Sequence, residues 1–289
     1  MTAAAACGAD APSGPACAGF DEGTSAGNVI AAAIDEASGI AASRVNPGVL
    51  WVHNDAGDEA RLYALNAEGT LLATFALTGV AAGDWEDLAI GPGPDPARSY
   101  IYVGDIGDNE LTRPQVAVHR VAEPKVDPAA RDVSASLSDV TTFALSYPDT
   151  PNNAESVLVD PSDGAVYLLT KHEDGRSTML RVAGDPPATL EPIVTLAFGA
   201  GALGGGGRLV TGGDIAPDGK ELVIRTRGAA FVWRREAGEP WSDVLATDPC
   251  RVALRSEPQG EAVAYAADGS GLYTISEGRN QPVYFYARR

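Results

Sequence analysis

Residues 155–171, ESVLVDPSDGAVYLLTK, place two short apolar stretches on either side of a Pro-Ser-Asp-Gly turn. An Asp-Gly turn between two runs of strand-forming residues is the strongest local signal for a β-hairpin. The hairpin opens on an acidic residue, Glu155, and ends on a basic one, Lys171. The segment therefore predicts two antiparallel strands with charged groups at their shared end.

The same pattern recurs along the chain. Each copy has a first strand that opens with a small or acidic residue, a turn rich in Pro, Asp or Gly, and a second strand that ends in polar residues. A third strand follows each copy and a fourth follows the first four copies, which is the composition of a β-propeller blade. The copies begin at Ser38, Glu86, Glu155, Gly213 and Glu261.

The repeats predict an all-β fold, a five-bladed β-propeller with four-stranded antiparallel blades. A degenerate sixth blade between residues 106 and 152 is the alternative. Because the last copy ends at Arg289 after three strands, the segment GNVIAAAI at 27–34 is expected to complete the last blade and close the ring. Residues 1–26 are predicted to be a flexible exported N-terminus, and residues 27–289 a single domain.

The charge and hydrophobicity of the chain limit the kinds of partner that it is expected to bind. The 289 residues include 39 acidic and 21 basic side chains, a formal net charge of -18, which repels nucleic acids and anionic lipid surfaces. No run of the sequence reaches the roughly 18 apolar residues that span a bilayer. We expect a monomer that binds a small-molecule substrate or ligand, with no nucleic acid and no membrane span. The acidity suits divalent cations, or only keeps a secreted protein soluble.

The N-terminus and the cysteines indicate a secreted, extracytoplasmic protein. The first 28 residues are low in complexity, as at the start of a mature exported chain whose signal peptide is replaced by Met1. Cys7, Cys17 and Cys250 fit neither a zinc spacing nor a CxxC motif. In an exported protein two of them are expected to pair, either Cys17 with Cys250 or Cys7 with Cys17.

Acidic residues open most of the first strands. In a propeller these strands line the central channel, so their opening residues would point together toward the axis. Carboxylates that lie so close together cannot all stay ionised unless a cation or a shared proton relieves their repulsion. The alternative is that they accept hydrogen bonds from neighbouring backbone N–H groups and tie the blades together. The predicted ligands of a Ca²⁺ ion, or of another divalent cation, are Glu86, Glu155, Asp214, Glu261 and Asn54.

Polar residues at the ends of the second strands surround this ring. Lys171 and Arg225 or Arg227 suit a phosphate or a carboxylate. His53 follows the apolar run VLWV and is a candidate proton carrier, as is Asp105, although a lone His at a strand end is also explained by hydrogen bonding. The predicted catalytic residues are His53, Asp105, Lys171, Arg225 and Arg227.

Two loops share a D-x-G-D pattern, at Asp55–Asp58 and Asp105–Asp108. Either loop could bind a metal by itself. Alternatively, Gly57 and Gly107 supply a positive φ and the Asp side chains form Asx turns.

The chain has no G-x-S-x-G, H-E-x-x-H or P-loop motif. Their absence removes support for a serine hydrolase, a zinc metalloprotease or a nucleotide-binding protein. With acidic openings at Glu86, Glu155 and Glu261, the chain resembles secreted bacterial β-propellers. In site chemistry it is similar to the calcium-dependent propeller hydrolases, namely paraoxonases, gluconolactonases and diisopropylfluorophosphatase, and more distantly to propellers called phytase-like. The resemblance implies calcium-dependent hydrolysis of phosphotriesters, phosphodiesters, esters or lactones. The alternative is a non-catalytic secreted propeller that binds a carbohydrate, a peptide or an envelope component, with any calcium structural.

Overall fold

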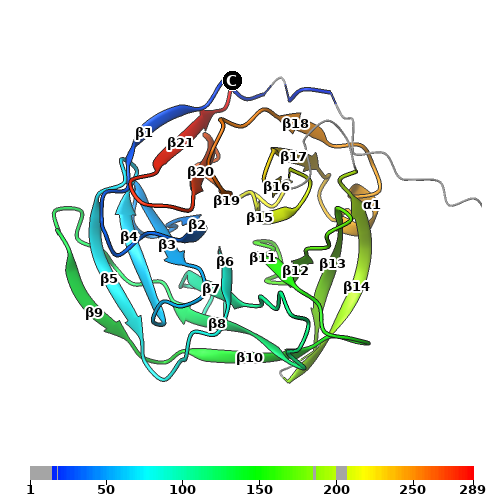
Figure 1. The fold of residues 1–289 in the computed structure, drawn as a ribbon, viewed down its shortest axis with the longest axis horizontal. Coiled ribbons are helices and arrows are strands. Elements are labelled where there is room, and N and C mark those ends of the chain that lie inside the picture. The colour runs from blue at the N-terminus through cyan, green and yellow to red at the C-terminus, as the bar shows by residue number, and fades with distance from the viewer. Residues whose placement is uncertain (1–14, 18, 185–186, 200–206) are drawn as a thin grey trace, which may run out of the picture.

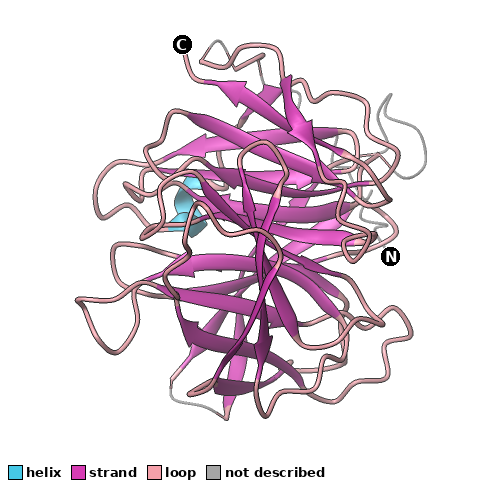
Figure 2. Ribbon diagram, turned by 90° about the vertical axis from the view of Figure 1, so that its left-hand side faces the viewer, coloured by secondary structure: helices cyan, strands magenta, loops and turns pink. Residues whose placement is uncertain are grey.

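The computed structural model describes residues 15–17, 19–184, 187–199 and 207–289. These residues form twenty-one strands and one short helix, α1 (Trp241–Val244). Figure 1 shows the strands arranged as a ring around a centre. Figure 2 shows the same ring from its side, with loops at both ends of the strands.

The first sheet has five strands. Four of them pair with antiparallel neighbours, and the fifth runs parallel to the fourth at the outer edge. In order across the sheet they are β2 (Ala37–Ala42), β3 (Val49–Asn54), β4 (Arg61–Asn66), β5 (Leu71–Leu77) and β9 (Val133–Leu137).

The largest sheet has eight strands. In order they are β11 (Ala154–Val159), β12 (Val166–Thr170), β13 (Arg176–Ala183), β14 (Ala188–Ala197), β10 (Thr141–Ser146), β8 (Val116–Ala122), β7 (Tyr100–Asp105) and β6 (Trp85–Gly91). Two antiparallel halves meet where β10 pairs in parallel with β14, at the lower right of Figure 1.

The other two sheets have four strands each. One has the order β15 (Val210–Ile215), β16 (Glu221–Thr226), β17 (Ala229–Arg234) and β18 (Cys250–Val252). The other has the order β1 (Thr24–Asn28), β21 (Pro282–Ala287), β20 (Gly271–Ser276) and β19 (Gly260–Tyr265).

This topology corrects the predicted fold class. The five hairpins of the repeat are present, but the described strands form sheets of four, eight, four and five strands, so the prediction of five or six separate four-stranded blades is wrong. The difference arises at the outer edges, where β10 joins β14 and β9 adds to β5. Parallel neighbours come from segments far apart in the chain, so the hairpin repeat does not encode them.

The N-terminal strand lies earlier than the sequence predicts. Strand β1 pairs with β21 through Thr24–Asn28, and the run predicted as a strand at 27–34 continues as loop after Asn28. The run is apolar because Val29 and Ile34 are buried in the core.

Strands β2, β6, β11, β15 and β19 lie nearest the centre of the ring, and each packs against the next (Figure 1). Every residue in these five inner strands is buried. A polar side chain on an inner strand therefore needs a partner, because an unpaired buried polar group lowers stability.

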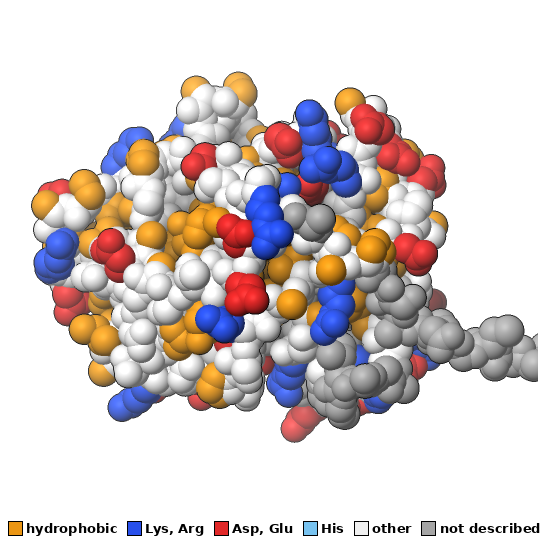
Figure 3. Space-filling view, turned by 90° about the horizontal axis from the view of Figure 1, so that it is seen from above, with side chains coloured by type: hydrophobic (Ala, Val, Ile, Leu, Met, Phe, Trp, Pro, Cys, Tyr) orange, Lys and Arg blue, Asp and Glu red, His pale blue; other side chains and the backbone are white. Residues whose placement is uncertain are grey.

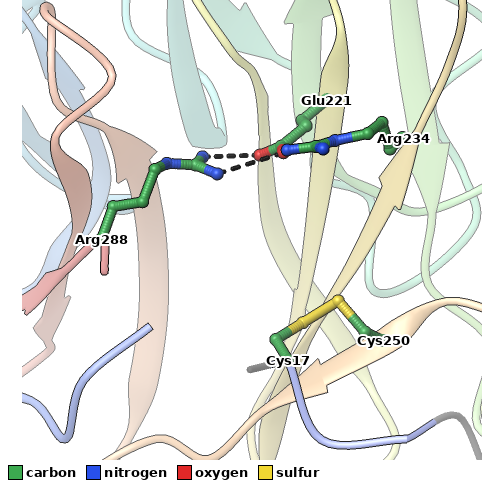
Figure 4. Close-up of a disulfide and its surroundings, with 5 residues drawn as sticks. All are labelled: Cys17, Glu221, Arg234, Cys250 and Arg288. Atoms are coloured by element: carbon green, nitrogen blue, oxygen red, sulfur yellow. Dashed lines mark hydrogen bonds and ion pairs between the residues drawn. A yellow bond between two sulfur atoms is a disulfide. The ribbon is translucent and has the colours of Figure 1, made fainter. Parts of the chain in front are cut away.

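A disulfide fastens the N-terminal segment to the fold. Of the two predicted pairings, the structure has Cys17 with Cys250 (Figure 4), and Cys7 lies outside the described residues. The Cys17 N–H also donates to the Arg251 carbonyl at 2.9 Å. Beside the disulfide, Arg234 and Arg288 both bind the Glu221 carboxylate. Residues 15–17, which the sequence assigns to a flexible N-terminus, are thus bonded to strand β18.

None of the described residues belongs to a helix long and apolar enough to cross a membrane. On the side of the molecule seen in Figure 3, acidic and basic side chains are interspersed with small apolar areas.

Removing the disulfide should lower the free energy of unfolding. The bond spans 233 residues, and a cross-link over a long segment reduces the entropy of the unfolded chain, so we expect a loss of about 2–4 kcal/mol. Urea unfolding of Cys17→Ser/Cys250→Ser measures this in a Cys7→Ser background, where no thiol remains to form another pair. Equal midpoints for the variant and the Cys7→Ser parent would contradict the assignment.

Candidate functional site

A β-bulge occurs at the same place in all five inner strands. In each one, the register with the second strand skips a single residue near the opening of the inner strand. A bulge leaves that residue unpaired and re-aims its side chain. The five bulge residues are Ser38, Glu86, Glu155, Thr211 and Glu261.

The two hydroxyl bulge residues tie inner strands together. Ser38 Oγ donates to the Glu86 carbonyl at 2.6 Å, and Thr211 Oγ1 donates to the Gly260 carbonyl at 3.1 Å. These two hydroxyl groups thus link neighbouring inner strands, whereas the hydrogen bonding between blades was predicted for the glutamates.

The three bulge carboxylates are buried and have raised pKa values. Glu86, Glu155 and Glu261 are only 5%, 3% and 4% exposed. Burial raises the pKa of Glu155 to about 7, with Glu261 adding to the shift and Lys171 opposing it. Burial also raises the pKa of Glu261 to about 7 against the opposing effect of Arg227. The inner strands thus bring all three predicted glutamates into one acidic centre.

Two predicted cations pair with two of these carboxylates. Lys171 Nζ lies 2.5 Å from Glu155 Oε1, which also accepts from the Asn153 amide at 2.9 Å. Arg227 lies 3.4 Å from Glu261 Oε1 and keeps 36% of its side chain exposed. Lys171 and Arg227 are therefore both at the predicted site.

Glu86 has a different environment. Its carboxylate accepts no hydrogen bond and forms no ion pair with any residue that the structure describes. One oxygen each of Asp55, Asp84 and Glu86 lie within 4.8 Å of one another. Burial, followed by repulsion from Glu155, Asp55 and Asp84, raises the pKa of Glu86 well above its usual range. We call Asp55, Asp84 and Glu86 the acidic triad.

The loop after β7 holds Asp84 in the triad. The Asp105 carboxylate accepts the N–H groups of Gly83 and Asp84 at 3.0 Å each, and Arg113 binds it at 2.6 Å. Burial alone would raise the pKa of Asp105, but the His119 ring 3.7 Å away and hydrogen bonds from the Asp84 N–H and Arg113 lower it to about 2. Asp105 thus positions the backbone of Asp84, and its lowered pKa does not favour the predicted proton-carrying role.

Gly107 makes room for the triad. A Cβ at this position would lie 2.2 Å from Glu86 Oε1 and 2.5 Å from Asp84 Oδ2. Gly107 is not among the glycines with positive φ, so that prediction is wrong, whereas Gly57 has the predicted positive φ of 96°. Close approach of the two carboxylates is the reason for a glycine at 107.

His53 and Asn54 do not reach the acidic centre. His53 is fully buried, stacks edge-on against Trp85, and has Nδ1 2.7 Å from the Asn54 carbonyl. Burial lowers its pKa, so the imidazole is neutral. The Asn54 amide donates to the Ala33 carbonyl and to Asp58. His53 Nδ1 and the Asn54 amide thus bond to groups of the first sheet and its loops, and the catalytic and metal-binding roles of these residues stay predictions.

Arg225 and Asp214 also have structural roles. The Arg225 guanidinium is fully buried, pairs with Glu257 and donates to the Ala262 carbonyl at 2.7 Å. Asp214 lies three residues beyond the bulge residue Thr211 and accepts the Tyr265 N–H at 2.8 Å. The sequence alignment placed Asp214 too close to the ring because Gly213 occupies the position that is apolar in the other copies, so Ile215 was aligned in its place.

The remaining D-x-G-D carboxylates hold their own loops. Asp58 binds Arg61, Tyr63 and Asn54, and Asp108 accepts the N–H groups of Thr112 and Arg113 at 2.9 and 2.8 Å. These contacts agree with the turn-forming alternative.

Sequence reasoning missed Asp84. It precedes the bulge residue Glu86 by two positions in the segment GDWED. The sequence signal that could have identified Asp84 is a second acidic residue at the opening of an inner strand.

A scan against models of protein families finds none that matches the chain, and a search of curated proteins finds no relative. The resemblance to calcium-dependent hydrolases therefore stays a prediction.

Replacing Glu261 with Gln should change how stability depends on pH. A carboxyl whose pKa is about 7 in the folded state and 4.5 when unfolded holds a proton that the unfolded chain has lost between these values. The wild-type free energy of unfolding should therefore fall as pH rises from 4.5 to 7. Without Glu261 this slope should flatten by at most about 1.4 kcal/mol per pH unit.

Urea unfolding at several pH values, with EDTA present, measures the slope. Glu191→Gln, on the exposed face of β14, is the matched control. Identical slopes for Glu261→Gln and wild type would show that Glu261 ionises normally.

Proposed function

We propose that the protein is a metal-dependent hydrolase that binds a divalent cation at the acidic triad and cleaves a phosphoester, ester or lactone beside it. The observation that carries this proposal is the buried and unpartnered carboxylate of Glu86, 5% exposed, with Asp55 and Asp84 beside it. Every other buried carboxylate of the described residues accepts a hydrogen bond or forms an ion pair, so a cation is the partner that we propose for Glu86.

The donor set favours a hard cation. All three ligands are carboxylate oxygens, which suit Ca²⁺ or Mg²⁺ rather than a softer metal. Ca²⁺ accepts an irregular set of six to eight oxygens, so it is the ion we propose. Asp55 and Asp84 are only partly buried, which leaves room on their side for water or a substrate oxygen.

The neighbouring residues supply the rest of the chemistry. The cation polarises the C=O or P=O bond of the substrate. Glu155, with a pKa of about 7, replaces His53 as the proposed proton carrier, because a general acid or base works best when its pKa is near the working pH. Arg227 is the more exposed of the two cations and is proposed to bind an anionic group of the substrate.

A second candidate is a non-catalytic binding protein in which the cation is structural. The observation in its favour is that Lys171 and Arg227 already pair with Glu155 and Glu261. Both candidate functions use the metal site, but only the hydrolase would turn over a substrate.

Replacing Glu86 with Gln should weaken cation binding by at least about 10- to 100-fold, because the most buried carboxylate of the triad is lost. Calorimetric titration of EDTA-treated protein with Ca²⁺, Mg²⁺ and Mn²⁺ measures the affinity. Glu191→Gln again serves as the control and should bind as the wild type does. Unchanged affinity in Glu86→Gln would remove the proposed site.

Gly107→Ala tests the geometry without changing a charge. The added Cβ would overlap the carboxylates of Glu86 and Asp84, so we expect cation affinity to fall while the fold is kept. Gly19→Ala, whose Cβ would meet nothing within 4 Å, is the control. Wild-type affinity in Gly107→Ala would mean that the ion binds elsewhere.

Turnover separates the two candidate functions. A panel of aryl phosphotriesters, phosphodiesters, carboxylic esters and lactones is assayed with EDTA and again with Ca²⁺ restored. The hydrolase predicts activity that depends on Ca²⁺ and is lost in Glu155→Gln, which should still bind the cation. Cation binding without turnover of any substrate class would favour the binding protein.

A further inference from the structure

Strand β8 places an arginine on an apolar face of the large sheet. Val116 and Val118 belong to the core between β6–β8 and β11–β13. Because side chains alternate along a strand, Arg120 points to the same face as these valines. The same core includes Leu145 of β10 and Ala188 of β14, so this face extends to the parallel pairing of these two strands.

Aromatic rings surround the Arg120 guanidinium. Its centre lies 5.6 Å from the Tyr100 ring, 6.0 Å from Tyr102 and 4.8 Å from Phe143. Such contacts favour a cation but do not neutralise it. Arg120 is half-buried and forms no ion pair with any acid of the described residues, although acidic side chains outnumber basic ones by 39 to 21 in the sequence.

Arg120 lines two cavities. The larger, about 370 Å³, is also lined by Arg98 and by the hydroxyl residues Ser136, Ser138 and Thr141. Arg98 lies 5.9 Å from the Tyr100 ring, so both guanidinium groups flank one aromatic side chain.

The smaller cavity, about 190 Å³, is apolar apart from its basic residues. Tyr102, Phe143, Val166 and Val182 are among the residues that line it together with Arg120.

The acids of the larger cavity leave the arginines uncompensated. Glu123 turns toward the first sheet, where it accepts from Trp51 Nε1 at 2.9 Å and from Ser43. Asp139 is exposed and forms no ion pair with a described residue. An anion in the larger cavity would thus meet a lining that includes two guanidinium groups and three hydroxyl side chains.

We propose that these cavities form a binding site for a small organic carboxylate with an apolar body. The carboxylate binds Arg98 and Arg120 in the larger cavity, since guanidinium groups match its two oxygens. The apolar body lies against Phe143, Val166 and Val182 in the smaller one. The site is separate from the acidic triad and does not depend on the proposed hydrolase function.

Fluorine NMR of 4-fluorobenzoate tests this proposal, with 4-fluorobenzamide as a neutral molecule of the same shape. We expect saturable binding of the benzoate that weakens with added salt, and binding of the benzamide that is about tenfold weaker or more. This comparison uses the unaltered protein, so it does not depend on the folding of any variant. Equal affinity for the two probes, or no saturable binding of the benzoate, would overturn the proposal.

Substitutions locate the site. Arg120→Gln should weaken benzoate binding by about tenfold or more, and Arg98→Gln by less because Arg98 is exposed. Arg131→Gln, an exposed arginine that contacts only nearby carbonyls, should bind as the wild type does. Benzoate binding that survives in both Arg120→Gln and Arg98→Gln would assign the carboxylate to another part of the protein.

Discussion

The side-by-side packing of five inner strands, each bulged at the same register, places Glu86, Glu155 and Glu261 in one buried centre. Burial and mutual repulsion oppose the ionisation of all three, so each carboxylate needs a proton, a cationic side chain or an ion. Lys171 meets that need at Glu155 and Arg227 meets it at Glu261. Glu86 has two further carboxylates beside it, those of Asp55 and Asp84. The proposed cation site follows from this excess of negative charge.

At the opposite ends of the strands, two buried acids each have several hydrogen-bond and ion-pair partners. Asp160, directly after β11, binds Arg235 at 2.7 Å and accepts from Trp241 at 3.0 Å, and these and other donors lower its pKa despite burial. Glu221 binds both Arg234 and Arg288, with the same effect on its pKa. Asp87 and Asp214, which accept hydrogen bonds from the neighbouring inner strand, keep raised pKa values because no cationic side chain pairs with them. Glu86 differs from all four of these acids because no donor among the described residues reaches its carboxylate.

Local sequence predicted the hairpins, and it predicted that glutamates open three inner strands, because turn residues and strand alternation act over a few residues. The joining of sheets at β10 and β14 depends on contacts between distant segments and could not be predicted from the repeat. Asp214 was misplaced because two glycines obscured the register of β15. His53 and Arg225 were assigned to the site by strand position alone, although their rings and guanidinium groups turn into the core.

The most direct test of this account is long-wavelength anomalous diffraction from crystals grown with Ca²⁺. The account predicts one calcium peak at roughly 2.3–2.6 Å from carboxylate oxygens of Asp55, Asp84 and Glu86. An empty triad with Glu86 protonated and hydrogen-bonded to one of the two aspartates would contradict it, since the buried charge would then be relieved by a proton and not by an ion.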